Sequence, residues 1–174
     1  MAPGTILWGW ALVEQGQREE GITQMRQGLA ALKATGTELD RPRLLALLAE
    51  AYGSVGQTEA GLTTLTEALA TAHKTGGLLW EAELHRLKGE LLLTLSAEKH
   101  AEAETCFHQA LDLAHRQQAK SLELRAAMSL ARLWQQQGKR DDAYALLAPI
   151  YGWFTEGFDT ADLQDAKALF EALA

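Results

Sequence analysis

One stretch of the chain carries histidine and carboxylate side chains at a spacing that metal sites use. Glu104, His108, Asp112 and His115 follow one another at intervals of three or four residues. In a helix these side chains would share about 80° of the surface. Such groups can ligate zinc, but the same spacing is typical of ion pairs on a solvated helix face. Because no further ligand can be placed beside them, we expect a solvated face and no bound metal.

No nucleophile in the sequence is paired with a recognisable base. Cys106, the single cysteine, stands beside Phe107 in a helical pattern, which is typical of a small core residue. The serines lack the G-x-S-x-G turn, and neither a G-x-x-x-x-G-K-[ST] loop nor a G-x-G-x-x-G motif is present. Asp141 and Asp142 stand at a predicted helix start, where carboxylates complement the helix dipole. We therefore predict no catalytic residues and no cofactor, so the chain is not expected to be an enzyme.

The composition indicates an all-helical protein. Of 174 residues, 47% are hydrophobic and only 3 are proline; leucine and alanine dominate the apolar set, which favours helix over sheet. No apolar run is long enough to span a membrane, and the first residues lack the basic region of a signal peptide. The formal net charge of −7 argues against binding to nucleic acid. We expect a cytoplasmic protein with no nucleic-acid or membrane partner, since no helix combines a basic polar face with an aromatic apolar face.

The chain repeats itself with a period of 40 to 42 residues, which is the sequence signature of a repeat architecture. Turn-like segments recur at 14–17, 54–57, 95–98 and 137–140, and the third contains two extra residues near 98–100. Small residues recur before and after these turns, at Gly9, Ala49, Gly89 and Ala131, and at Gly21, Gly61, Ala103 and Ala143. A glycine inside a helix costs about 1 kcal/mol relative to alanine, so we expect these positions to be where two helices cross closely.

Each repeat has the apolar spacing of two helices. The expected helices cover residues 3–15, 17–35, 41–55, 57–75, 77–95, 99–117, 120–137, 139–156 and 160–173. The repeats are expected at 1–38, 39–77, 78–119 and 120–157, followed by a cap at 158–174, all within a single domain of residues 1–174.

The spacing resembles the tetratricopeptide repeat (TPR). A small residue, a leucine or aromatic three later and a small residue twelve later appear as Gly9, Leu12 and Gly21, and again as Ala49, Tyr52 and Gly61. The period is longer than the 34 residues of that family. HEAT repeats share the longer period but have a proline pattern that is missing here. The resemblance implies a right-handed α-solenoid of about four extended hairpins plus a C-terminal capping helix.

Three segments, 18–22, 80–91 and 151–160, resemble the C-terminal repeats of large bacterial signalling proteins. In those proteins a nucleotide cyclase or DNA-binding domain is joined to an AAA/STAND-type ATPase and then to the repeats. The resemblance implies a regulatory scaffold arm for protein–protein interaction in signal transduction. The first expected helix starts late relative to the repeat pattern, so we expect Met1 to follow a cut in a longer array or to start a shortened protein.

The concave face of such a solenoid is the candidate binding surface for a protein or peptide segment. The TPR pattern places there Trp10, Arg43, Ala46, Glu50, Glu83, Arg86, Glu90, Arg125, Met128, Arg132, Gln135 and Gln136. The charges could also pair between repeats, Glu83 with Arg43 and Arg125, and Glu90 with Arg132. Both roles are compatible with one another.

The two ends of the array carry separate expectations. Leu7, Trp8 and Trp10 would be exposed at the N-terminal edge, which lacks the polar outer face of a capping repeat; a homodimer through this edge, acting as a self-association element without a separate ligand, is the alternative function. At the other end, Asp159 or Thr160 is expected to cap the last helix, and Pro149 is expected to kink the helix before it. The apolar stripe of that last helix comprises Leu163, Ala166, Leu169, Phe170 and Leu173.

Overall fold

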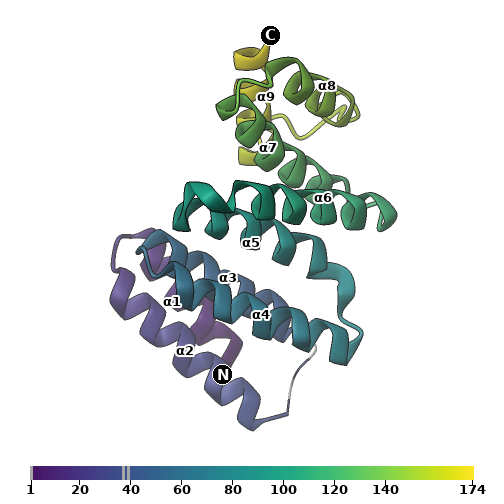
Figure 1. Ribbon diagram of the computed structural model, residues 1–174. Helices are drawn as coiled ribbons and strands as arrows, with labels where there is room; N and C mark the ends of the chain where they lie inside the picture. Colours follow the sequence, from purple (N-terminus) through teal and green to yellow (C-terminus); the bar gives the residue numbers. More distant parts are fainter. Residues whose placement is uncertain (1, 37, 39) are drawn as a thin grey trace.

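The protein is an array of antiparallel helices (Figure 1). The computed structural model describes residues 2–36, 38 and 40–174, and no strand occurs among them. The helices are α1 (Ala2–Glu14), α2 (Arg18–Ala34), α3 (Arg41–Ser54), α4 (Thr58–Thr75), α5 (Glu81–Leu95), α6 (His100–Arg116), α7 (Lys120–Gln136), α8 (Arg140–Tyr151) and α9 (Ala161–Leu173); two 3-10 turns, η1 (Leu78–Trp80) and η2 (Ala97–Lys99), precede α5 and α6. The expected all-α architecture is confirmed.

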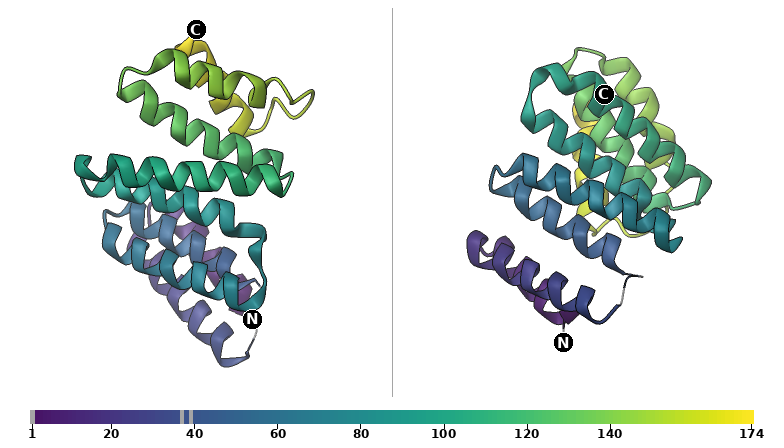
Figure 2. Two further views of the ribbon diagram at one scale, coloured as in Figure 1. Left: turned by 45° about the vertical axis from the view of Figure 1, so that its right-hand side comes forward. Right: turned by 60° about the horizontal axis from the view of Figure 1, so that its bottom comes forward.

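The helices pair into four consecutive hairpins that stack from one end of the molecule to the other. In each hairpin, α1/α2, α3/α4, α5/α6 and α7/α8, the two helices are in extensive contact. The two termini lie at opposite ends of the stack (Figures 1 and 2). Within the described residues, α1, α3, α5, α7 and α9 contact one another in series, and no comparable series of contacts joins α2, α4, α6 and α8. The first helices therefore line the inner side of an α-solenoid, as the repeat pattern predicts.

Glycines with a left-handed backbone close three of the hairpins. Gly16, Gly56 and Gly138 have φ of 88°, 76° and 77°, a region that glycine adopts without steric cost. The third hairpin has no such glycine. Its longer turn contains the three-residue η2, where the Ser96 hydroxyl accepts a hydrogen bond from the Glu98 backbone N–H at 3.1 Å.

The recurring small residues mark the places where paired helices cross. A Cβ on Gly21 would lie 2.4 Å from the Gly9 carbonyl oxygen, and one on Gly9 would lie 2.6 Å from the Gly21 carbonyl oxygen. In the third hairpin a Cβ on Gly89 would lie 2.4 Å from the ring of Phe107. The close approach inferred from the sequence is confirmed, and it explains why glycine is tolerated inside these helices.

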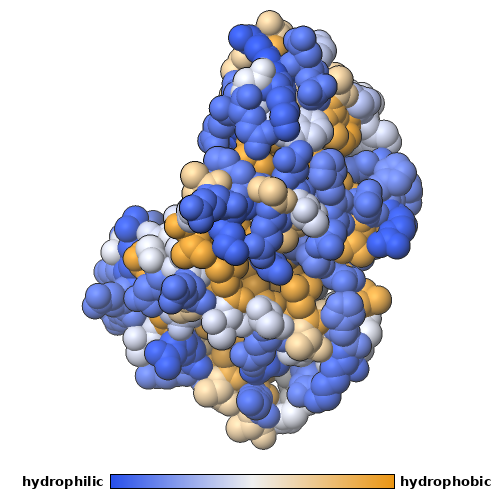
Figure 3. Space-filling view, viewed as in Figure 1, coloured by the Kyte–Doolittle hydropathy of each residue, from blue (hydrophilic) through white to orange (hydrophobic). Residues whose placement is uncertain are grey.

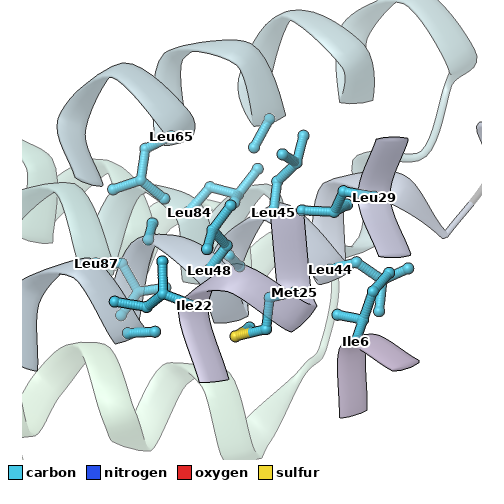
Figure 4. Packing of buried hydrophobic residues seen from close by; sticks show 14 of the residues in the cluster. Ile6, Ile22, Met25, Leu29, Leu44, Leu45, Leu48, Leu65, Leu84 and Leu87 are labelled. Atoms are coloured by element: carbon cyan, nitrogen blue, oxygen red, sulfur yellow. The ribbon is translucent and has the colours of Figure 1, made fainter. Parts of the chain in front are cut away.

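Leucine and alanine fill the space between successive hairpins. The N-terminal part of the core joins Ile6 and Met25 of the first hairpin to leucines of α3, α4 and α5 (Figure 4). A second cluster around Phe107 joins α5, α6 and α7, and a third joins α7, α8 and α9. The core thus continues along the stack because each hairpin buries one face against the next.

The last helix covers the end of the array. Leu163, Ala166, Leu169 and Leu173 are buried, and the ring of Phe170 stacks on the rings of Tyr144 and Tyr151 at centroid distances of 4.8 and 5.6 Å. Arg140 of α8 donates hydrogen bonds to the carbonyl oxygens of Ala172 and Leu173, at 2.8 and 2.9 Å. These bonds satisfy acceptors that the end of a helix leaves free. The expected capping helix is confirmed.

Two details at this end differ from the sequence prediction. The helix expected over 139–156 ends at Tyr151, and Pro149 lies inside its last turn. Thr160 stands at the N-cap of α9, but its hydroxyl donates a hydrogen bond to the Gly157 carbonyl oxygen at 2.7 Å and caps no N–H of the helix.

The surface seen in Figure 3 is mostly polar. Hydrophobic residues, shown in orange, cluster near the middle of the molecule, at the level of α3 to α5. Large exposed apolar side chains lie elsewhere too: Leu7 and Trp8 of α1 are 44% and 60% exposed, and Trp153 after α8 is 58% exposed. None of the helices described is both long enough and apolar enough to cross a lipid bilayer.

Candidate partner-binding groove

The first helices enclose an open cavity of about 220 Å³ on the inner side of the solenoid. We call it the inner groove. It is lined by Trp10, Arg43, Ala46, Leu47, Glu50, Trp80, Glu83, Leu87 and Arg125. These residues come from α1, α3, η1, α5 and α7, so the stacking of three hairpins and the start of a fourth is needed to form it.

The structure brings together only part of the predicted binding set. Of the residues expected on the concave face, Trp10, Arg43, Ala46, Glu50, Glu83 and Arg125 line the inner groove. Arg86 and Glu90 lie beside it in an ion-pair network described below. Arg132, Gln135 and Gln136 are exposed near the C-terminal end of α7 and do not line the cavity.

Met128 is buried in the core and does not line the inner groove. It is 4% exposed and packs in the cluster that α7 forms with α8 and α9. The repeat pattern assumes that this position faces an open groove, but α9 packs against α7 and covers it. The prediction for Met128 was therefore wrong.

A buried ion-pair network forms the wall between the third and fourth hairpins. Glu83 accepts hydrogen bonds from Arg86 Nε and Nη2 at 2.9 and 2.8 Å, and its Oε1 lies 2.9 Å from Arg125 Nη1. The side chains of Glu83 and Arg86 are 8% and 11% exposed. Asp162 extends the network to α9, with its Oδ2 at 3.6 Å from Arg125 Nε. The predicted pair of Glu83 with Arg125 is confirmed.

The remaining predicted pairs were wrong. Glu90 lies 3.4 Å from Arg86 Nη1 on its own helix and accepts a hydrogen bond from the Ser129 hydroxyl at 2.6 Å, whereas Arg132 forms no ion pair with any described residue. Arg43 pairs with Asp40 at the start of α3, at 2.9 Å, instead of Glu83. The reason is local: Asp40 stands three residues before Arg43, within reach on the same helical turn.

The pKa values of Glu50 in the groove and of Arg86 beside it are both shifted. Partial burial raises the pKa of the Glu50 carboxyl; attraction to Arg86 and Arg125 opposes this, and repulsion from Glu83 and Glu14 adds to it. Burial lowers the pKa of Arg86, but its hydrogen bond and attraction to Glu83, with further attraction to Glu90 and Glu50, outweigh burial, so the net pKa is raised. The raised pKa of Arg86 favours its cationic form, whereas the raised pKa of Glu50 means that its carboxyl is protonated more readily than an ordinary glutamate.

Sequence reasoning missed Trp80 as a groove residue. Trp80 ends η1, just before the acidic first turn of α5, and the guanidinium of Arg43 lies 5.9 Å from its ring centroid. The repeat pattern assigns no binding role to this junction. A tryptophan directly before a helix start was the only sequence signal that could have pointed to it.

The histidine and carboxylate stripe of α6 serves local contacts. Glu104 accepts a hydrogen bond from Trp134 Nε1 at 2.7 Å, and His115 Nδ1 lies 3.0 Å from Glu123 Oε1. Cys106 is buried, and burial raises the pKa of its thiol, which is unfavourable for a nucleophile. Among the residues that the structure describes, no three histidine, cysteine or carboxylate side chains are grouped to hold a metal ion.

Helical hairpins that stack with their first helices inward define an α-solenoid, and known structures identify its type. A crystal structure of a kinesin light chain-like protein from Podosopora anserina, built of nearly identical TPR-like repeats, superposes with a TM-score of 0.73 at 17% identity and covers 98% of this chain and 84% of that one. The Q17M variant of that protein gives a TM-score of 0.74 at 16% identity, with the same coverage. The chain therefore has a TPR-like fold. No protein-family model and no curated protein matches the sequence.

Proposed function

We propose that this protein is an interaction module that holds a peptide segment of a partner protein in the inner groove. The observation that carries the proposal is the cavity itself, which opens on the inner side and is lined by tryptophan and charged side chains from four different helices and η1. Tryptophan and arginine are enriched among the residues that dominate binding energy at interfaces. TPR-like proteins of known structure share the fold, which supports a scaffold role rather than catalysis.

The broader setting of the proposal comes from the sequence. The likeness of 18–22, 80–91 and 151–160 to bacterial signalling proteins supports a role as the regulatory arm of a larger cytoplasmic signal-transduction protein. Residues 1–174 would act there as one repeat domain. The proposed partner is a protein and not a nucleic acid, because Arg43 and Arg125 in the groove and Arg86 beside it are already paired with carboxylates. No uncompensated basic stripe is left for phosphates.

Two tryptophans of α1 provide a matched test. Trp10 lines the groove, whereas Trp8, two residues away, does not. Short random peptides displayed on phage would be selected on the full chain, and the selected peptides measured by fluorescence anisotropy. We expect Trp10→Ala to weaken their binding at least about tenfold, because a tryptophan that a bound partner covers is a typical hot spot. We expect Trp8→Ala to leave binding unchanged. Equal affinity for the Trp10→Ala variant would refute groove binding, and circular dichroism would check that both variants keep their helices.

Self-association is a second candidate function, favoured by the exposure of Leu7 and Trp8 on α1. Terminal repeats of solenoids normally present a polar outer face, and this edge does not. We expect a concentration-dependent dimer in sedimentation experiments that Trp8→Ala converts to a monomer. A wild-type chain that stays monomeric at high concentration would rule out this alternative.

A further inference from the structure

The inner groove is lined by two arginines, Arg43 and Arg125, and two glutamates, Glu50 and Glu83. These arginines and the adjacent Arg86 are already engaged. Arg43 pairs with Asp40, Arg86 with Glu83 and Glu90, and Arg125 with Glu83 and Asp162. Every guanidinium at the groove therefore has at least one carboxylate partner within the protein. A partner with acidic side chains would have to compete with these internal pairs.

Glu50 is the carboxylate of the groove that has no partner. It lines the cavity but forms no hydrogen bond or ion pair with any residue that the structure describes. The nearest opposite charges, Arg86 and Arg125, are bound to Glu83, and Glu14 at the end of α1 adds a second negative charge that repels it. The carboxylate is thus left facing the open cavity, where an incoming cation would find it.

The walls beside Glu50 suit the side chain that would carry this cation. Trp10 contributes a ring that is 36% exposed, and Trp80 lines the same cavity. The groove already places a guanidinium against an aromatic wall, since Arg43 lies 5.9 Å from the centroid of Trp80. Arginine and lysine bury their aliphatic stems on apolar surface while the charged end finds a counter-ion, and tryptophan attracts such cations most strongly.

The volume also favours one side chain over a free small molecule. About 220 Å³ is below the range of about 300–1,000 Å³ that small-molecule sites occupy. An open groove of this size accepts a single long residue from an extended peptide, with the rest of the peptide lying along the inner helices.

We propose that the partner segment is basic and that one of its arginine or lysine side chains enters the inner groove between Trp10 and Trp80 to pair with Glu50. This inference rests on the proposed peptide-binding function and specifies its chemistry. Glu50 then gains the counter-ion that the protein does not supply. An acidic segment would instead bring further negative charge beside Glu50, Glu14 and Glu83.

The test uses the phage-selected peptides, the full chain and a matched pair of charge-neutralising variants. Glu50→Gln removes the unpaired groove carboxylate, and Glu20→Gln removes an exposed carboxylate from α2, outside the groove, with the same change in net charge. We expect arginine and lysine to be enriched among the peptides whose binding Trp10→Ala weakens. Fluorescence anisotropy should then show a loss of about tenfold or more for Glu50→Gln, no loss for Glu20→Gln, and weaker binding at high salt.

Two results would overturn the inference, and they are distinguishable. Peptides that depend on Trp10 but are rich in aspartate or glutamate, or that bind equally well to the Glu50→Gln variant, would refute the basic-segment inference and leave groove binding intact. A selection in which no peptide depends on Trp10 would refute both groove binding and the inference. Replacing the key arginine of a selected peptide by citrulline, which keeps its shape without the charge, should reproduce the loss seen with Glu50→Gln.

Discussion

The guanidinium of Arg125 in α7 lies 2.9 Å from the carboxylate of Glu83 in α5, and this contact ties the first helices of two successive hairpins together at the wall of the inner groove. The two partners differ in burial, since the side chain of Glu83 is 8% exposed and that of Arg125 is 34% exposed. The same carboxylate also holds Arg86 through two hydrogen bonds. Glu83 is therefore the central group of the network, and its loss should be felt more than the loss of Arg125.

The first prediction concerns this network. Glu83→Gln should lower the free energy of unfolding by about 3 kcal/mol, because it leaves the buried Arg86 without its main counter-ion. Arg125→Gln should cost about 1 kcal/mol or less, since its side chain reaches solvent. Urea unfolding followed by circular dichroism measures both. Similar small losses for the two variants would show that Glu83 is not the central group.

The second prediction concerns the crossing of α1 and α2. Gly21→Ala places a methyl group 2.4 Å from the Gly9 carbonyl oxygen, so the two backbones must separate. Overpacking of this kind costs about 1–3 kcal/mol, and we expect it to exceed the gain of about 1 kcal/mol in helix propensity. Gly4→Ala is the control, because a Cβ there meets no other atom within 4 Å. A thermal melt should show a clear loss for Gly21→Ala and none for Gly4→Ala; a gain for both would contradict close packing at the crossing.

The third prediction concerns the cap. Deleting residues 159–174 removes four buried apolar side chains of α9, and the larger of these are worth about 1.5–3 kcal/mol each. That sum is comparable to the stability of a whole domain, so the shortened chain should aggregate or lose helix content. Leu169→Ala is a milder version that should cost about 2–5 kcal/mol, and Lys167→Ala, on the exposed side, should cost little. An unchanged melting temperature after the deletion would show that α9 is only an appendage.

The fourth prediction concerns the pH dependence that Glu50 imparts. Its pKa in the folded protein is raised above the ordinary value of 4.5, because partial burial and repulsion from Glu83 and Glu14 outweigh the attraction to Arg86 and Arg125. Between the two pKa values the folded state therefore binds more protons than the unfolded state, and the contribution of Glu50 to stability falls as pH rises through that window.

Glu50→Gln removes the loss of stability that Glu50 causes as pH rises. Relative to the wild type, the variant should be equally stable at about pH 4, where the carboxyl is largely protonated in both states, and slightly more stable at about pH 7. The gain should stay within about 0.5 kcal/mol because the side chain is partly exposed to water. Melting curves at the two pH values measure it. A variant that is less stable than wild type at neutral pH would show that Glu50 has a stabilising partner within the protein.

Much of the architecture was determined by the sequence alone. The helical spacing of leucine and alanine located the nine α-helices found among the described residues, because helix formation and the burial of one face depend on residues three and four apart. The hairpin crossings could be predicted from Gly9, Gly21 and Gly89. At such a crossing the partner helix lies so close that a Cβ would clash with it, and this requirement does not depend on how the hairpins then stack. The two extra residues of the third turn were also visible, since they interrupt a regular period.

The tertiary structure decided which predicted groove residues share a cavity and which charges pair. Met128 is covered because α9 folds back onto α7, an event set by residues more than thirty positions away. Arg43 pairs with the nearby Asp40 and not with Glu83. Glu90 contacts Arg86 and Ser129 and not Arg132. A long side chain can reach several partners, so only the packed geometry decides which contact forms. Trp80 lines the groove because it stands at the end of a short 3-10 turn, η1, which the repeat pattern does not predict. Local periodicity determines helices, whereas a binding surface depends on the relative placement of helices that are distant in the chain.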